Sequence, residues 1–302
     1  PTPSSARSSA ARGAPAGASP GPSTRASQAG AGAGPGRPLE IGTNMAANSG
    51  DGAPTTSAAD PHAEALDALI RAEGFPESTR FAYAYGSGAY AQAGYADATT
   101  PAERPMLDLL LCVDDPLEWH RQNMTARRSD YSAVASLGAE RVAKLQAGSA
   151  GVWYNTLVPM SGSEQEGRLM KYGVVSWDKL QEDLRTWRWL YLAGRLHKPV
   201  RASSGAAAAE VAAAHHANLL GAARTSLLLL PEDFSRYDFY MTIAGLSYAG
   251  DFRMQFGENP DKVRNIVEPN LAHFEDLYAP VLKDLEPFCA WGARPAELAA
   301  AG

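Results

Sequence analysis

Residues 106–113 of the 302-residue chain, MLDLLLCV, form a near-continuous apolar run that contains a single charge, Asp108. A run of this length is typical of a strand that is buried on both faces of a sheet. Burying a carboxylate there costs free energy unless the carboxylate is paired with a cation or bound to a metal ion. The run therefore predicts a functional metal ligand at Asp108, with a structural salt bridge as the alternative.

The segment before this run predicts a second strand that ends in a glycine-rich bend. Aromatic residues alternate with alanines in residues 81–85, and Gly86-Ser87-Gly88 follows them. Glycines let backbone N–H groups approach a phosphate closely, and the Ser87 hydroxyl adds a donor. A carboxylate on the neighbouring strand can hold Mg²⁺ against such a phosphate. Together these features indicate a nucleotidyltransferase site, although a glycine pair at a strand end is most often a simple turn.

Strand and helix patterns alternate along the rest of the chain. Asp115 before Pro116 and Ser176 before Trp177 are typical helix N-caps. The expected elements are helices from about 63, from 116, at 177–193, at about 205–224 and from about 262, and strands at 151–159 and 168–176. Strands interleaved with helices place the chain in the α+β (α/β-like) class.

Two of the helical segments carry more specific expectations. The alanine-rich residues 205–217 are interpreted as a surface insertion. An apolar stripe at helical spacing runs from Leu271 to Leu285 and suits either a membrane interface or the protein core. Acidic neighbours such as Glu275 and Asp276 oppose adsorption to anionic lipid, so the core is the favoured interpretation.

Charge is distributed unevenly and excludes several classes of protein. Residues 1–37 contain four arginines and no acidic residue, so this segment carries a net charge of +4. The whole chain has a net charge of −6, so the rest of the chain carries −10. An acidic body argues against a general nucleic-acid binder.

Residues 1–60 read as a disordered leader, either an organellar transit peptide or a plain disordered tail. Two cysteines argue against a disulfide scaffold or zinc cluster, and no apolar run approaches the ~20 residues of a membrane span.

Further candidate site residues lie outside the apolar run. Asp251 and Arg253 alternate with apolar neighbours, so on a strand both would face the same side, one to bind metal and the other phosphate. Lys171 interrupts another apolar strand. The alternative for Asp251 and Arg253 is a simple surface pair. The alternative for Lys171 is a lysine on an edge strand whose ammonium group extends to solvent. No P-loop, nucleophile elbow or His-Glu-x-x-His motif is present.

Several sequence blocks together resemble one family. The blocks YGSGAYAQ, MLDLLLCVDDPLEWHRQN, KYGVVS, IAGLSYAGDFRM and DKVRNIVEPN follow one another in order between about Phe81 and Tyr278. They resemble the mitochondrial CDP-diacylglycerol synthase family, also called mitochondrial phosphatidate cytidylyltransferases. The combination is highly specific, although Gly-Ser-Gly alone is not.

The resemblance implies a fold and an activity. It implies a nucleotidyltransferase-like mixed sheet with helices over residues 61–200, and a smaller helical, winged-helix-like part over 201–302 in which about 245–258 returns to the active site. It implies Mg²⁺-dependent conversion of CTP and phosphatidic acid into CDP-diacylglycerol and pyrophosphate, an early step of cardiolipin and phosphatidylglycerol synthesis. It also implies peripheral contact with the matrix side of the mitochondrial inner membrane, and no nucleic-acid partner.

The resemblance suggests that the Gly86-Ser87-Gly88 bend holds phosphates and that Asp108 holds metal. The roles of the other residues, which lie in blocks that match the family, are our own inference. Asp108 and Asp251 are expected to hold Mg²⁺ and act in catalysis with Lys171. One departure is that Leu110 stands where the wider superfamily has a second acid, which is why Asp251 is expected to supply the missing ligand. The residues expected to bind CTP are Gly86, Ser87, Gly88 and Lys171, and those expected to bind phosphate or the lipid headgroup are Arg195, Lys198, Arg253 and Lys262.

Two other functions remain open on the sequence. The chain could be a nucleotidyltransferase with a different acceptor, or a non-catalytic assembly factor of the mitochondrial import machinery. Joint retention of Ser87, Asp108 and Asp251 argues against the non-catalytic alternative.

Overall fold

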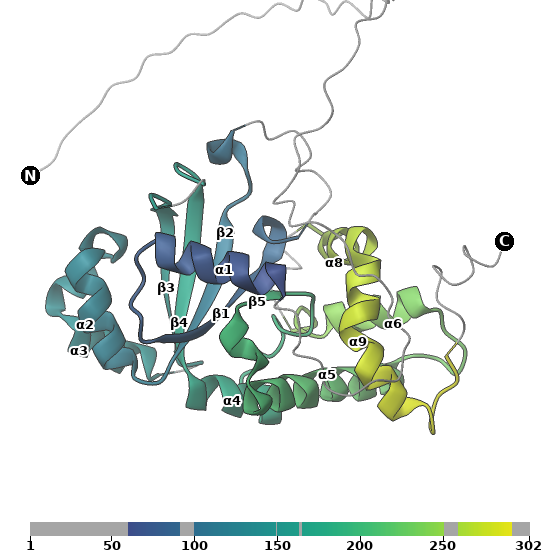
Figure 1. Ribbon diagram of the computed structural model, residues 1–302. Coiled ribbons are helices and arrows are strands. Elements are labelled where there is room, and N and C mark those ends of the chain that lie inside the picture. Colours follow the sequence, from purple (N-terminus) through teal and green to yellow (C-terminus); the bar gives the residue numbers. More distant parts are fainter. Residues whose placement is uncertain (1–59, 91–99, 149, 163–164, 251–258, 292–302) are drawn as a thin grey trace, which may run out of the picture. The chain divides into compact units, whose positions relative to one another are not determined.

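A computed structural model describes residues 60–90, 100–148, 150–162, 165–250 and 259–291 (Figure 1). Five strands in these residues form one mixed sheet in the order β3-β4-β2-β1-β5. β2 lies at its centre, antiparallel to β1 and parallel to β4. The strands are β1 (Thr79–Tyr85), β2 (Leu107–Val113), β3 (Val152–Pro159), β4 (Leu169–Ser176) and β5 (Arg201–Ala202). The α+β class is therefore confirmed.

The apolar run forms the central strand, as predicted. Residues 109–113 of β2 are almost completely buried, because both faces of the sheet are covered. On one face, helices α1 (Pro61–Ala72) and α2 (Pro116–Ala126) contribute Leu66, Ile70 and Trp119 to the core. The other face is covered by α4 (Trp177–Thr186) and the first turns of α5 (Ala209–Leu229). Residues of β2 alternate between these two cores.

Side-chain caps fix the starts of the helices that leave the sheet. The Asp115 carboxylate accepts hydrogen bonds from the N–H groups of Leu117 and Glu118, and Pro116 occupies the first helical position of α2. The Ser176 hydroxyl caps α4 by accepting from the Lys179 N–H. Both predicted N-caps are confirmed. Between α2 and β3 the chain forms α3 (Ala139–Gln146).

Helix α4 ends earlier than the sequence pattern predicted. The expected helix extended to Ala193, but α4 stops at Thr186 and Trp187 adopts a left-handed conformation with φ of 53°. The reason is the buried carboxylate of Asp183, which accepts four backbone hydrogen bonds of 2.8–3.0 Å from residues 189, 190, 192 and 193. These bonds replace helical bonding with a compact loop, which we call the Asp183 loop (residues 187–199).

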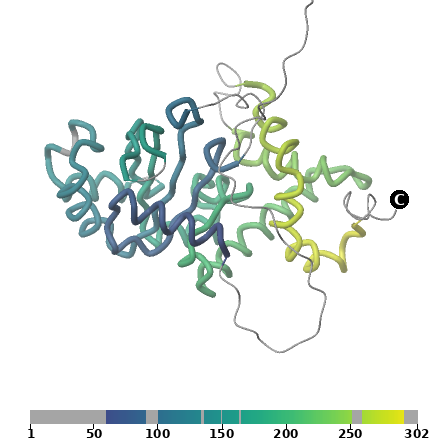
Figure 2. Tube along the Cα trace, turned by 45° about the horizontal axis from the view of Figure 1, so that its top comes forward, coloured from purple at the N-terminus to yellow at the C-terminus, as the bar shows by residue number. Residues whose placement is uncertain are grey.

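The remaining helices form a third core beside the sheet (Figure 2). They are the second half of α5 together with α6 (Arg236–Gly245), α8 (Lys262–Val267) and α9 (Leu271–Leu285). The apolar stripe of α9 is buried here, so its assignment to the core is confirmed. The expectation of a surface insertion at 205–217 was wrong, because Val211 and Ala214 are fully buried under the sheet. No helix among the described residues is long and apolar enough to cross a bilayer.

Replacement of Asp183 by asparagine is expected to lower the free energy of unfolding by about 3 kcal/mol, because an amide nitrogen would face N–H donors that now bond a carboxylate. Urea denaturation of the full chain measures the change. Asp178→Asn, an exposed change in the first turn of the same helix, is the control and should cost less than about 1 kcal/mol. Equal effects of the two variants would contradict this role for Asp183.

Candidate active site

A cavity of about 400 Å³ lies where β1 ends and where β2 and β4 begin. The sheet contributes the Gly86-Ser87 bend, Asp108 and Lys171 to its lining. The Asp183 loop contributes Arg195 and Lys198, and the helical part contributes Lys262. The cavity thus collects the predicted site residues that lie in the described parts of the chain, with the exception of Gly88.

Asp108 and Lys171 form an ion pair at the base of this cavity. They occupy matched positions on the parallel strands β2 and β4, and the Lys171 ammonium donates to the Asp108 carboxylate at 2.9 Å. Burial lowers the pKa of Lys171, but the Tyr85 hydroxyl and the Asp108 carboxylate outweigh burial and leave it raised. The structure therefore contains the salt bridge that was the alternative interpretation of Asp108. The pair is nevertheless open to the cavity, with 17% of the Asp108 side chain and 25% of the Lys171 side chain exposed.

The glycine bend lies against this pair. Gly86 has φ of +73°, which favours glycine, and a Cβ there would stand 3.0 Å from the second Asp108 oxygen. Ser87 lines the cavity, whereas Gly88 contacts the Met106 carbonyl behind the bend, where any Cβ would clash. The bend can therefore present Ser87 and its backbone to an anion, while Gly88 allows the close approach of the chain behind it.

Two cations of the Asp183 loop line the opposite wall. The Arg195 guanidinium lies 4.0 Å above the Tyr191 ring and donates to the Tyr191 carbonyl. The Lys198 ammonium donates to the Gly194 carbonyl and, at 2.9 Å, to the Ser247 hydroxyl. Burial and the neighbouring Arg195 charge lower the pKa of Lys198 to about 7. An anion in the cavity would stabilise the protonated form of Lys198.

A buried polar junction holds this wall against the helical part. The Asn218 side-chain oxygen of α5 accepts from the Trp187 indole at 2.8 Å and from the His197 imidazole at 3.0 Å. The Tyr278 hydroxyl of α9 donates to the His197 carbonyl at 2.9 Å. Because burial lowers the pKa of His197 to about 3, this imidazole is neutral and Nε2 donates to Asn218. The third core and the Asp183 loop thus fix each other.

The charges around the cavity suit a polyanionic ligand. Among the described residues that line it, four are cationic (Lys171, Arg195, Lys198 and Lys262) and Asp108 is the one carboxylate. Partial burial strengthens the attraction of these cations for phosphates. A magnesium–phosphate ligand fits this donor set, because Mg²⁺ commonly takes only one or two protein carboxylates beside substrate phosphates. Within the described residues no cluster of three or more metal-ligating side chains is present.

The structure adds lining residues that the sequence analysis did not select. Tyr85, Tyr90, Tyr191, Ser247 and Tyr248 all line the cavity. Tyr85 could have been selected, since it alternates with Phe81 and Tyr83 and directly precedes the bend. The others could not, because only tertiary packing brings them to the cavity. Asp251 and Arg253 lie outside the described residues.

The chain is similar to known proteins over most of its length. A family model described as phosphatidate cytidylyltransferase, mitochondrial, matches residues 68–294. The chain belongs to the mitochondrial phosphatidate cytidylyltransferase family. Proteins of that name from Xenopus laevis, Homo sapiens and Drosophila melanogaster are 47%, 44% and 46% identical to it, each over 70% of this chain. The alignments cover 60%, 45% and 64% of those relatives, so the chain spans less than two thirds of their length.

Anion binding in this cavity should weaken as pH rises, because Lys198 loses its proton near pH 7. Sulfate, which does not titrate in this range, isolates the protein's contribution. We expect its dissociation constant to rise up to about thirtyfold between pH 6 and pH 8.5, measured by titration calorimetry.

Two lysine variants test the origin of this pH dependence. Lys198→Met should bind sulfate weakly at every pH and show no dependence. Lys171→Met should weaken binding but keep the dependence, since the pKa of Lys171 is raised. A pH dependence that survives in Lys198→Met would assign it to another group.

Proposed function

We propose that this chain is a phosphatidate cytidylyltransferase that converts CTP and phosphatidic acid into CDP-diacylglycerol and pyrophosphate, an early step of cardiolipin and phosphatidylglycerol synthesis. Family membership and the names of the relatives support the proposal. The structural observation that carries it is the Asp108–Lys171 pair beside the Gly86-Ser87 bend, inside a cavity rich in cations. The site suits a reaction in which both substrates are phosphate anions.

The same proposal extends to the domains. Residues 61–200 would form a nucleotidyltransferase-like part and 201–302 a smaller helical, winged-helix-like part, with about 245–258 returning to the active site. The sheet, the third core, and the presence of Ser247 and Tyr248 in the cavity lining support this division. β5 nevertheless pairs with β1, so the polypeptide of the second part begins inside the sheet.

The chemistry requires positioning and charge neutralisation rather than proton removal. A phosphate oxygen of phosphatidic acid attacks the α-phosphorus of CTP, and the bond from that phosphorus to the bridging oxygen of pyrophosphate breaks. The nucleophile is already anionic at neutral pH, so no general base is needed. The barrier comes from bringing an anion up to a triphosphate, and fixed cations lower it.

The residues selected from the sequence have proposed parts in this reaction. Ser87 and the backbone of Gly86 and Gly88 would hold the CTP phosphates, assisted by Lys171. Lys171 would also act in catalysis by neutralising charge near Asp108. Arg195, Lys198 and Lys262 would bind the lipid phosphate and the departing pyrophosphate, as would Arg253. Lys198 is suited to this because a bound phosphate holds it in its charged form.

Magnesium is the proposed cofactor. Asp108, with Asp251 as the second ligand, would hold it next to the CTP phosphates. When bound, Mg²⁺ supplies further neutralisation of triphosphate charge. The Lys171 ammonium would then keep the Asp108 carboxylate oriented toward the bend, since it already bonds one of the two carboxylate oxygens.

A phosphatidate substrate implies that the cavity rim touches a bilayer. Trp189 and Tyr191 are 44% and 39% exposed on the Asp183 loop, and Tyr191 also lines the cavity. Exposed Arg188 lies 5.7 Å from the Trp189 ring and pairs with Glu182 at 2.7 Å, so the aromatic side chains and not this charge carry the argument. Tryptophan and tyrosine favour the membrane interface. We therefore propose that peripheral membrane contact is made through Trp189 and Tyr191. The matrix side of the mitochondrial inner membrane is the location that the family resemblance implies.

Asp108→Asn should leave a folded protein whose turnover falls at least a hundredfold, because charge and metal binding are lost together. The assay is pyrophosphate release by the full chain with CTP, Mg²⁺ and phosphatidate vesicles. Asp114→Asn is the matched control at the opposite end of β2, where Asp114 pairs with Arg80 at the surface.

Two results would contradict the proposed function. Failure of the unmodified chain to bind Mg²⁺–CTP would favour the non-catalytic assembly factor. Binding of CTP without pyrophosphate release on phosphatidate, but with release on a different acceptor, would favour another nucleotidyltransferase.

Trp189→Ala should reduce flotation of the protein with vesicles of phosphatidylcholine and phosphatidate by about fivefold, since an interfacial aromatic anchor is removed. Leu228→Ala is the matched control, because Leu228 is also exposed but lies at the end of α5. A larger loss for Leu228→Ala would move the membrane contact to the helical part.

A further inference from the structure

Arg168 is a buried guanidinium directly behind the glycine bend. It precedes β4 and is only 3% exposed. Its Nε donates to the Pro105 carbonyl at 2.8 Å, and one terminal nitrogen donates to the Gly88 carbonyl at 2.9 Å. The other terminal nitrogen donates to the Gln165 side chain at 3.3 Å. All three acceptors are uncharged.

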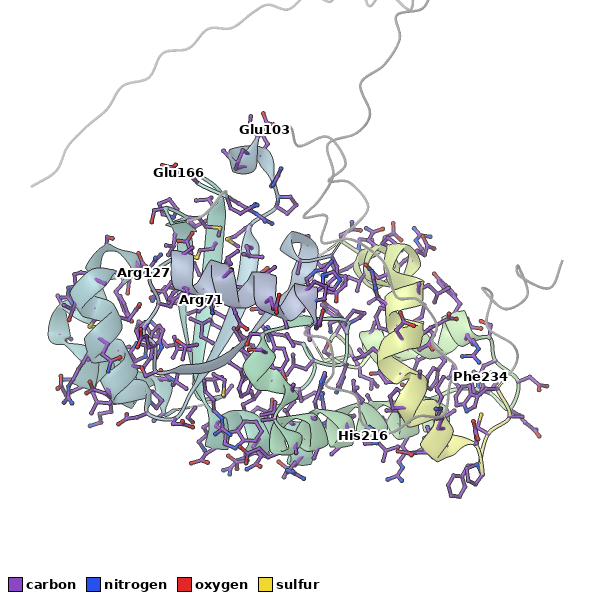
Figure 3. The ribbon with its side chains drawn as sticks, in the orientation of Figure 1. Arg71, Glu103, Arg127, Glu166, His216 and Phe234 are labelled. Atoms are coloured by element: carbon purple, nitrogen blue, oxygen red, sulfur yellow. The ribbon has the colours of Figure 1, made fainter. Side chains whose placement is uncertain are left out.

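The charge of Arg168 is not balanced by a carboxylate among the described residues. A second cation, Arg104, lies close by and donates to the same Gln165 oxygen. Burial and Arg104 lower the pKa of Arg168 to about 10, so it stays charged at neutral pH. Glu103 and Glu166, which Figure 3 labels at this end of the sheet, are solvent-exposed. Burying an unbalanced charge costs free energy, so its position calls for an explanation.

The contact with Gly88 gives that explanation. Gly88 follows Ser87, whose side chain lines the cavity, and a Cβ on Gly88 would lie 3.0 Å from the terminal nitrogen of Arg168. The peptide group between Gly88 and Ala89 is bonded on both sides. Its carbonyl oxygen accepts from Arg168, and its N–H group, that of Ala89, donates to the Gly86 carbonyl at 3.1 Å. The guanidinium therefore holds the shape of the bend and places a positive charge within a few ångströms of its rear.

We propose that Arg168 is a positioning residue for the nucleotide triphosphate: it fixes the Gly86–Gly88 bend from behind and attracts the phosphate chain through it. The inference rests on the proposed function, since it takes the bend to be the phosphate-binding element. Arg168 does not touch the ligand. Its effect should grow with the number of phosphates, because it acts on the phosphate chain and not on the nucleoside.

The test compares ligands of increasing charge on matched variants. Dissociation constants of CTP, CDP, CMP and cytidine in Mg²⁺ are measured by calorimetry for the full chain, for Arg168→Lys and for Arg168→Gln. We expect Arg168→Gln to weaken CTP about thirtyfold and CMP less than about threefold. Arg168→Lys keeps the charge but not the forked bonds, so its loss for CTP should be intermediate.

Arg127→Lys is the control for a buried arginine with a purely structural role. Arg127 is also largely buried, pairs with Glu73 and Asp130, and lies on the α2 side of the sheet (Figure 3). This variant should lower the melting temperature and leave all four dissociation constants unchanged. If Arg168→Gln is not folded, as shown by the absence of a cooperative unfolding transition, the comparison is made with Arg168→Lys. An unchanged CTP dissociation constant in Arg168→Lys then counts against the proposal.

Other outcomes separate this inference from the proposed function. Equal weakening of CTP and CMP in folded Arg168 variants, or no weakening of either, would overturn the positioning role. If the unmodified chain binds CTP, shows the charge-graded effect at Arg168 and yet releases no pyrophosphate with phosphatidate, the positioning role stands and the proposed reaction fails.

Discussion

The ion pair between Asp108 and Lys171 depends on the parallel pairing of β2 with β4, and the sheet side of the site is built around that pair. The apolar run of β2 is buried on both faces, which leaves the end of the strand as the place where a carboxylate reaches solvent. The Gly86 bend closes over one carboxylate oxygen and Lys171 holds the other. A carboxylate fixed in this way is oriented before any ligand binds.

The sheet alone does not complete the cavity. Arg195 and Lys198 come from the Asp183 loop, and this loop is held by α5 and α9 through Asn218 and Tyr278. The third core therefore serves the site indirectly, by fixing the wall that carries two of its cations. Folding of the helical part and assembly of the anion site are for this reason coupled.

How far the sequence predicts this structure depends on whether the signal is local. The central strand and the N-caps at Asp115 and Ser176 follow from apolar pattern and cap chemistry, which act within a few residues. The end of α4 did not follow, because the Asp183 carboxylate overrides helical spacing through bonds to residues six to ten positions later. Arg168 was missed for a related reason: its burial and its contact with Gly88, 80 positions earlier, exist only in the fold.

The Asp183 loop also bears on how the cavity adapts to its ligands. Four backbone N–H groups converge on one buried carboxylate, and residues 187 and 190 hold left-handed backbone angles without being glycines. Such a wall has few alternative conformations, so it is preorganised. The conformational entropy of ordering Arg195 and Lys198 is then lost during folding, and binding does not have to overcome it again.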